Sequence, residues 1–474
     1  MTIDGNLNPA DLSTSLTRVF ELAQKKVRLI DKTWDPARGT PVFTLQGKYT
    51  SRGWTEWTQG FQYGCALLTF DATGDRDLLE LGRRNTLEKM APHVTHTGVH
   101  DHGFNNLSTY GNLRRLMREG KIPHNEWELN FYELAIKASG AVQAARWSGV
   151  PVAQPSPHSA NSKSLGYIYS FNGPHSLFID TMRTLRILGL SWQLGHHLAH
   201  ENDRKADLLK RSVLHALCTN QYIIFHGDSD HAYDVSGRTA HEGTFNRNDG
   251  AFRARSTQQG YSPFSTWTRG LAWAMLGYAE QLEFFATIDP DQFEQSVGLK
   301  KHDVVAVYES AARATCDHYI NDCSAADGIV YWDDGAPGLA RMPDWRSRPA
   351  DPFNDHEPVD ASASAIAAQG LLRLGHYLDN EGSVGGGGKY TQAGLAVART
   401  LFSDAYLAPD TDAHHGLLLH SIYHRPNNWD FTPPGREVPC GESSMWGDYH
   451  LLELAVYLHR LARGERYLAF FDAE

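Results

Sequence analysis

The sequence predicts an all-α fold, an (α/α)6 barrel in which six helical hairpins form an inner and an outer ring. Hydrophobic residues recur with a period near 3.6 in about twelve segments, each bounded by Gly, Pro, Asn or Asp. The links between these segments alternate between short and long, and short links are typical of antiparallel hairpins. If consecutive helices run antiparallel, every long link enters an even-numbered helix at its N-terminus. We therefore expect the even-numbered N-termini to meet at one rim.

The expected helices follow one another along the whole chain. They span residues 11–32, 56–72, 75–93, 103–118, 126–147, 177–197, 203–222, 263–286, 302–320, 361–378, 389–404 and 443–462. The long links are 148–176, 223–262, 321–360 and 405–442. Odd segments such as 126–147 show one solvated face, as outer helices do, whereas even segments begin with polar and aromatic residues. Strand signals are few, and an open solenoid would need a sequence repeat that is not visible. We expect one catalytic domain over residues 1–474.

Composition narrows the class of protein. The chain is 41% hydrophobic and 11% aromatic, enough for a large core, and its net charge of -11 is spread without long runs of one sign. We therefore expect no nucleic-acid or membrane partner. Five scattered cysteines without a metal-type pair indicate free thiols in a reducing compartment. Without a signal-peptide pattern or a bilayer-spanning window, the expectation is a soluble cytoplasmic protein, a monomer or homodimer.

Asp180 is the first candidate for chemistry. It directly follows Leu177, Phe178 and Ile179 and precedes an apolar helical run, so little water should surround it. Desolvation raises the pKa of a carboxyl group and makes it a usable proton donor. The alternative is an acidic first-turn residue that complements the helix dipole, which is the commoner role of such an aspartate.

A second carboxyl group, Asp101, stands at the head of the fourth expected helix, between His100 and His102. Two such carboxyls on one rim, one embedded in apolar residues and one among histidines, are typical of acid/base work on a glycosidic or enol-ether bond. The alternative for Asp101 is an N-cap. The two flanking histidines indicate a metal site only weakly, because they would point apart in an extended stretch; His356, His414 and His415 are the only plausible further ligands.

A third cluster joins His241 and Gln259 to the start of the eighth helix. Arg269 and Trp273 are four residues apart and share a helix face, where a guanidinium can reach a carboxylate beside a ring that stacks on a sugar. The alternative for Arg269 is a structural salt bridge to a rim acid. Trp57, ahead of the second helix, can stack on a sugar or serve plain packing.

These motifs together resemble a known family. The residues that carry the resemblance are His100-Asp101 before Gly103-Phe104, Phe178-Ile-Asp180-Thr-Met182, Gln259-Gly-Tyr-Ser with Trp267-x-Arg269-Gly-x-Ala-Trp273, Asp360-Ala-Ser-Ala-Ser-Ala-Ile-Ala, and Trp446-Gly-Asp-Tyr449. In this order, from about Trp57 to the C-terminus, they resemble the unsaturated glucuronyl hydrolases of glycoside hydrolase family 88. That family has an (α/α)6 barrel, in agreement with the helix count.

The resemblance implies removal of a terminal 4,5-unsaturated uronic acid from lyase-generated oligosaccharides by hydration of a vinyl ether, with no metal or organic cofactor. It makes Asp180 the group that protonates C4 and then helps water add at C5, and Asp101 the partner that binds ring hydroxyls. The resemblance further implies that seven residues contact the sugar, the last of which belongs to the segment around Ser421. These are His100, His241, Gln259, Arg269, Trp273, Trp57 and Tyr423.

The sequence departs from the family at the sugar-contacting positions. Gln258 stands where relatives often carry His, Phe171 stands where they carry Trp, and the segment from Ser421 to Trp429 lacks the Ser-x-x-Ser-x-Lys pattern of enzymes that accept sulfated substrates. Arg425 and Arg436 offer different anion contacts. Three alternatives stay open: an unsaturated rhamnogalacturonyl hydrolase, an (α/α)6 sugar epimerase and a carbohydrate-binding toroid.

Overall fold

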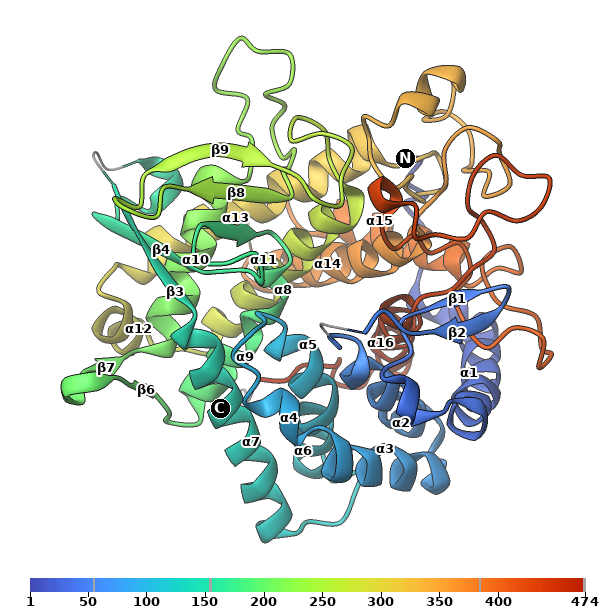
Figure 1. Cartoon of the computed structure of the whole chain (residues 1–474), viewed down its shortest axis with the longest axis horizontal. Coiled ribbons are helices and arrows are strands. Elements are labelled where there is room, and N and C mark those ends of the chain that lie inside the picture. Colours follow the sequence, from blue (N-terminus) through green and yellow to red (C-terminus); the bar gives the residue numbers. More distant parts are fainter. Residues whose placement is uncertain (54–55, 153–155, 383–384, 472–474) are drawn as a thin grey trace.

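Two concentric rings of helices make up most of the molecule (Figure 1). The computed structural model describes residues 1–53, 56–152, 156–382 and 385–471. The α-helices of these residues are α1 (Ser13–Thr33), α2 (Gln59–Thr73), α3 (Arg76–Lys89), α4 (Ala91–Val94), α5 (His102–Asn106), α6 (Asn112–Arg118), α7 (Glu126–Ala145), α8 (Thr181–Thr184), α9 (Arg186–Gln193), α10 (Leu208–Tyr222), α11 (Thr268–Ala286), α12 (Pro290–Val297), α13 (Lys301–His318), α14 (Ala361–Asn380), α15 (Gly388–Leu401) and α16 (Met445–Ala462).

The inner ring closes on itself. Helix α2 packs against α5, α5 against α8, α8 against α11, α11 against α14, α14 against α16, and α16 back against α2. The outer helices α1, α3, α7, α10, α13 and α15 cover this ring from outside. Nearly every residue of α11, α14 and the first turns of α16 is buried, as expected of helices with neighbours on all sides. The predicted (α/α)6 barrel is therefore confirmed.

All twelve expected helices have a counterpart, but several differ in extent: the helix expected from residue 203 begins only at Leu208, and the segment 75–93 is divided into α3 and α4. The segment 103–118 is interrupted by a π-helical turn, Leu107–Gly111, and the short helix α12 was not expected. The segment expected to be helical from residue 177 instead begins with a strand, and the helix begins only at Thr181. The apolar run from Leu177 to Ile179 is equally compatible with a buried strand and a buried helix, which periodicity cannot separate.

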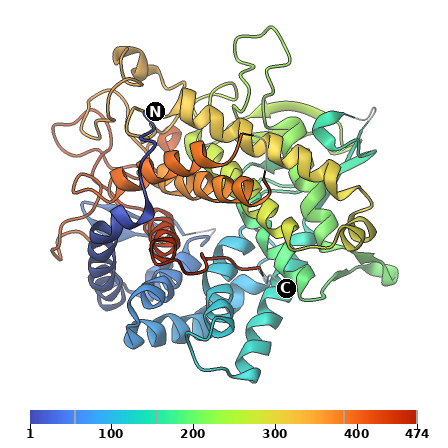
Figure 2. The ribbon, with the colours of Figure 1, turned by 180° about the vertical axis from the view of Figure 1, so that it is seen from behind.

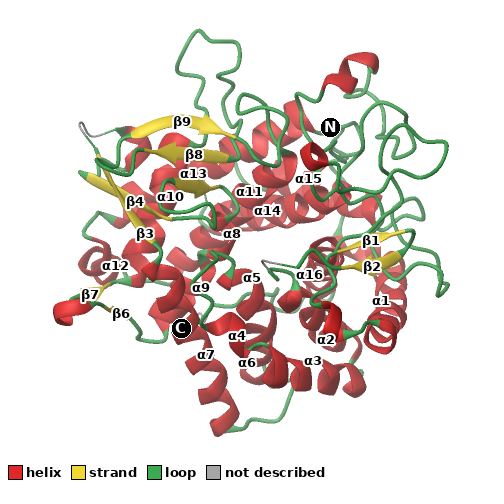
Figure 3. Ribbon diagram, in the orientation of Figure 1, coloured by secondary structure: helices red, strands yellow, loops and turns green. Residues whose placement is uncertain are grey.

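Short strands lie at the edge of the helical rings (Figure 3). They are β1 (Phe43–Leu45), β2 (Lys48–Thr50), β3 (Trp147–Pro151), β4 (Ser164–Ile168), β5 (Ser176–Phe178), β6 (Leu198–Ala199), β7 (Lys205–Ala206), β8 (Glu242–Phe245) and β9 (Phe252–Ser256). The antiparallel order β5-β8-β9 matters most, because it pairs Phe178 with Glu242 and so brings Asp180 beside His241. The backbone N–H of Ile179 also donates to the carbonyl of His241 at 3.0 Å.

The N-terminal tail is held on the far side of the barrel, where it runs along α15 (Figure 2). The backbone of Leu7 makes two hydrogen bonds with the side-chain amide of Gln392 in this helix. Within the described residues, no helix combines the length and the apolar character needed to cross a membrane.

Candidate active site

A cavity of about 690 Å³, open to solvent, lies at the rim where the inner helices begin. Seven of the nine site residues proposed from the sequence line this cavity, and they come from separate elements of the fold. These are Trp57, His100, Asp101, Asp180, Gln259, Arg269 and Tyr423. The N-termini of α2, α5, α8 and α11 thus meet at one place, as the alternation of link lengths predicted.

The two acidic residues at the cavity are not helix caps. Asp101 precedes α5 and Asp180 precedes α8, yet neither side chain accepts a hydrogen bond from the first turn of its helix. Asp360 on the same rim behaves differently, because its carboxylate accepts from the backbone N–H groups of Ser362 and Ala363 at the start of α14. The N-cap alternative for Asp101 is therefore wrong, and both cavity carboxyls keep oxygen atoms for another use.

Their environments push the two pKa values apart. Burial raises the pKa of Asp101 to about 7, and the negative charge of Asp180 adds to this effect against the opposing charge of Arg146. Burial also opposes ionisation of Asp180, but His241, His100 and Arg269 outweigh it, so the pKa of Asp180 is lowered. The two pKa values differ as predicted, but in the opposite order, since Asp180 was expected to have the raised pKa.

The reason for this reversal is His241, a residue from β8 that sequence spacing does not place beside Asp180. Nε2 of His241 lies 3.5 Å from Oδ2 of Asp180. Its Nδ1 accepts hydrogen bonds from the backbone N–H groups of Gln258 at 2.9 Å and Gln259 at 3.3 Å. Because a backbone N–H can only donate, the ring proton must be on Nε2, facing Asp180. His241 is fully buried and lies behind the carboxylate, away from the cavity wall.

His100 lies on the other side of the acidic pair. Its Nε2 is 3.8 Å from Oδ1 of Asp101, and burial lowers its pKa to about 3, so the ring is neutral at physiological pH. The neighbouring His102 turns into the core, where its two ring nitrogens pair with the Ser139 hydroxyl and the His96 carbonyl. Both ring nitrogens of His102 are thus occupied in the core, whereas His100 faces the acidic pair.

Arg269 is held mainly by the protein itself. One terminal nitrogen pairs with Asp360 at 3.2 Å and donates to the carbonyl of Ile422, and the other donates to Oε1 of Gln259 at 2.9 Å and to the carbonyl of Tyr423 at 2.7 Å. The salt bridge to a rim acid, which was the alternative for Arg269, is present, and Arg269 also lines the cavity. Since Oε1 of this cavity-lining residue accepts from Arg269, the amide N–H₂ of Gln259 is left as a donor.

Aromatic rings form the walls of the cavity. Trp57 stacks on Trp446 with ring centroids 5.0 Å apart, and Tyr423 packs against Trp446 at the same separation. Trp273 is different: it is buried one turn below Arg269, where it packs against Phe104 at 4.9 Å and His450 at 5.0 Å, and it does not line the cavity. The expected sugar contact of Trp273 is therefore replaced by support of the cavity floor.

Several residues that line the cavity were not proposed from the sequence as site residues, or were noted there only as departures from the family motifs. Phe171 and Gln258 line the cavity, so both departures from the family motifs bear on the site. His424, Asn427 and Trp429 line it as well. Their segment is folded by Asp430, whose carboxylate accepts from the backbone N–H of Tyr423 and of His424 at 3.0 Å. The many polar and aromatic residues between positions 421 and 430 were the feature of the sequence that could have identified this segment as part of the site.

Comparison with known proteins gives relatives but no matching family model. The chain is 24% identical over 406 residues to an unsaturated glucuronyl hydrolase of Formosa agariphila, an alignment that covers 84% of this chain and 78% of the relative. It is 24% identical over 432 residues to the unsaturated glucuronyl hydrolase of Bacillus sp. strain GL1, covering 89% of this chain and 90% of the relative.

Solved structures agree. The crystal structure of the Bacillus sp. GL1 hydrolase matches 95% of this chain and 96% of its own length with a TM-score of 0.65 at 20% identity. A variant of such a hydrolase, solved with dGlcA-Glc-Rha-Glc, matches 96% of this chain and 97% of its own length with a TM-score of 0.66 at 20% identity. The expected resemblance to unsaturated glucuronyl hydrolases is thus confirmed, and the structural likeness shows a shared fold.

Proposed function

We propose that this protein removes the terminal 4,5-unsaturated glucuronic acid from lyase-generated oligosaccharides by hydrating the vinyl ether. The observation that carries the proposal is a pair of carboxyl groups in one cavity, neither used as a helix cap, with pKa values shifted in opposite directions. The likeness to unsaturated glucuronyl hydrolases over most of the chain supports this reaction over the epimerase and binding alternatives.

In the proposed reaction water is added across the C4=C5 double bond. Asp180 gives a proton to C4, and positive charge develops at C5 and the ring oxygen. The Asp180 carboxylate then takes a proton from a water molecule as the water oxygen bonds to C5. The resulting hemiketal opens and expels the remaining sugar, so Asp180 ends the cycle in its starting protonation state.

The two carboxyls share one proton near neutral pH, because Asp101 titrates at about 7 while the pKa of Asp180 is lowered. In the free protein this proton is on Asp101. The substrate brings its own carboxylate into the cavity, and a further negative charge nearby raises the pKa of Asp180. Binding of the anionic sugar therefore favours protonation of the group that must donate to C4.

The remaining wall residues would bind the sugar. Trp57 and Tyr423 provide aromatic faces, and Gln259 provides an amide donor that Arg269 orients. Asp101 and His100 would contact ring hydroxyls. We assign His241 the role of fixing Asp180, because its Nε2–H faces that carboxylate from the buried side.

Loss of the ultraviolet absorbance of the conjugated enol carboxylate tests the proposal directly. Purified protein is mixed with unsaturated disaccharides prepared by different lyases, including glucuronyl and galacturonyl-rhamnose members. Decay on a glucuronyl substrate that disappears in Asp180→Asn supports the proposal. Faster decay on the galacturonyl-rhamnose member would favour the rhamnogalacturonyl alternative, and no decay on any member would refute hydration.

We further propose that residues 1–474 act as one catalytic domain, as a monomer or homodimer in the cytoplasm. The five cysteines are all free and buried, which is typical of proteins kept in a reducing compartment. The end of this proposed domain, residues 472–474, lies outside the described residues. Size-exclusion chromatography with light scattering tests the oligomeric state.

A further inference from the structure

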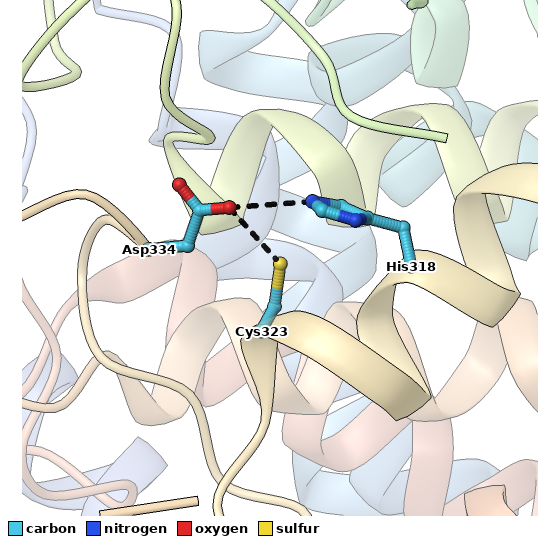
Figure 4. Close-up of side chains that lie close together, drawn as sticks. All are labelled: His318, Cys323 and Asp334. Carbon is cyan, nitrogen blue, oxygen red and sulfur yellow. Dashed lines mark hydrogen bonds and ion pairs between the residues drawn. The ribbon is translucent and has the colours of Figure 1, made fainter. Parts of the chain in front are cut away.

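Three potential metal ligands meet at the C-terminal end of α13, in a region that the proposed reaction does not use. His318 ends α13, Cys323 follows in the π-helical turn Tyr319–Cys323, and Asp334 comes from the next loop (Figure 4). Nε2 of His318 lies 3.3 Å from Oδ2 of Asp334, and Sγ of Cys323 lies 3.8 Å from the same oxygen. All three ligand atoms are within 4.8 Å of one another, and the three side chains are buried.

The two separations from Oδ2 of Asp334, 3.3 Å and 3.8 Å, are close to the edges of a tetrahedron around a small cation. Zinc binds histidine nitrogen and carboxylate oxygen at about 2.0–2.2 Å and thiolate sulfur at about 2.3 Å, so neighbouring ligands lie roughly 3.3–3.7 Å apart. A mixed set of nitrogen, sulfur and oxygen donors favours zinc or a similar transition metal over magnesium or calcium. Oγ1 of Thr266 is a further oxygen atom at the cluster, 3.1 Å from Nε2 of His318.

The surroundings resemble those of a bound metal in two further ways. The second ring nitrogen of His318, Nδ1, faces Oδ2 of Asp322 at 3.3 Å, and metal-binding histidines characteristically present their other ring nitrogen to a carboxylate. Arg238 lies 3.4 Å from Oδ2 of Asp334 and offsets part of the negative charge.

We propose that His318, Cys323 and Asp334 bind one zinc-class divalent ion that braces the loop between Gln259 and α11. Asp334 also accepts from the backbone N–H of Thr266 at 2.6 Å, just ahead of α11. The adjacent Asp333 accepts from the backbone N–H of Tyr261 at 2.8 Å. The ion thereby fixes both ends of the loop that follows Gln259. None of its ligands lines the substrate cavity, so its role is structural.

Binding releases the proton of the Cys323 thiol, because the thiolate is the ligand. Metal affinity is therefore expected to fall as the pH decreases, and uptake of zinc by the stripped protein should acidify a weakly buffered solution.

Metal content and cobalt spectroscopy test the site in the full-length protein. Protein prepared with zinc supplied should carry about one zinc per chain by elemental analysis. After chelation, added Co²⁺ should produce a thiolate-to-cobalt charge-transfer band. Cys323→Ser should lose both signals, whereas Cys316→Ser, which removes another buried thiol of α13 outside the cluster, should keep them.

A milder variant separates metal binding from folding. Asp322→Asn should weaken zinc binding about 10–100-fold while the chain still folds. Asp317→Asn is the matched control, since Asp317 pairs with Lys389 on the surface. The proposal is overturned if zinc-supplied wild-type protein holds no zinc and the stripped protein gives no cobalt–thiolate band. It is also overturned if Cys323→Ser retains full zinc content.

Discussion

Asp101→Asn is expected to stabilise the protein above neutral pH while it abolishes turnover. The pKa of Asp101 is about 7 in the folded protein against an ordinary value of 3.8, a rise of about 3 pH units. At 1.36 kcal/mol per unit this corresponds to at most about 4 kcal/mol. Because the folded pKa is the higher one, the bound proton adds stability below about pH 4, and this contribution is lost as the pH rises to about 7. Above that the wild type carries a buried charge that asparagine lacks.

Asp180→Asn provides the matched comparison with the opposite sign. The folded pKa of Asp180 is lowered, so its ionised form contributes stability above the unfolded value and loses it as the pH falls through the folded pKa. This variant should be less stable than the wild type at neutral pH and similar to it in strong acid. Both variants should lose turnover at least about 100-fold.

Thermal unfolding midpoints of the three proteins, measured by circular dichroism from about pH 4 to about pH 9, check the assignment. The difference between Asp101→Asn and wild type should grow in favour of the variant between about pH 4 and about pH 7 and then level off. The opposite result would refute the electrostatic reasoning. If, relative to the wild type, Asp180→Asn becomes more stable as the pH rises and Asp101→Asn becomes less stable, the proton of the free protein is on Asp180.

The remaining predictions concern the cavity walls. Arg269→Met should destabilise the protein by about 3–5 kcal/mol, seen as a lower unfolding midpoint, because the buried Asp360 carboxylate would lose its cationic partner while keeping its hydrogen bonds to the start of α14. Arg269→Lys keeps the charge but cannot hold Gln259, so kcat/KM should fall at least about tenfold; unchanged kinetics would contradict the orienting role. Trp57→Ala should raise KM about tenfold with a smaller effect on kcat, as expected for a lost stacking face. Trp273→Phe should lower the unfolding midpoint yet change KM less than twofold, because the ring does not line the cavity; a KM increase as large as that of Trp57→Ala would restore its sugar-binding role.

The architecture was predictable because it rests on local patterns. The 3.6-residue period marked the helices, and the alternation of link lengths placed Asp101 and Asp180 at one rim without knowledge of the tertiary contacts. The electrostatic order of the pair was not predictable. It depends on His241, which reaches Asp180 only through the pairing of β5 with β8, and on two backbone N–H groups that fix the tautomer of the ring.

The roles of Arg269 and Trp273 show the same limit. Spacing places both residues on one face of α11, but depth along the helix separates a side chain at the cavity wall from one in the core. The hydrogen-bond partners of Arg269 include carbonyls of Ile422 and Tyr423 from a link far along the chain. The sequence therefore identifies these side chains as unusual, whereas tertiary contacts decide what each one does.

The closed inner ring has a consequence for biogenesis. Trp57 precedes the first inner helix, α2, and stacks on Trp446 of the last inner helix, α16. The backbone N–H of Thr44 in β1 donates to the carbonyl of Ser443, and the backbone N–H of Met445 in α16 donates to the carbonyl of Val42. Such contacts between distant parts of a chain form late and slow the folding reaction. The aromatic wall of the cavity therefore cannot exist on the ribosome until synthesis is nearly complete. A nascent or prematurely terminated chain has no cavity in which to sequester the substrate.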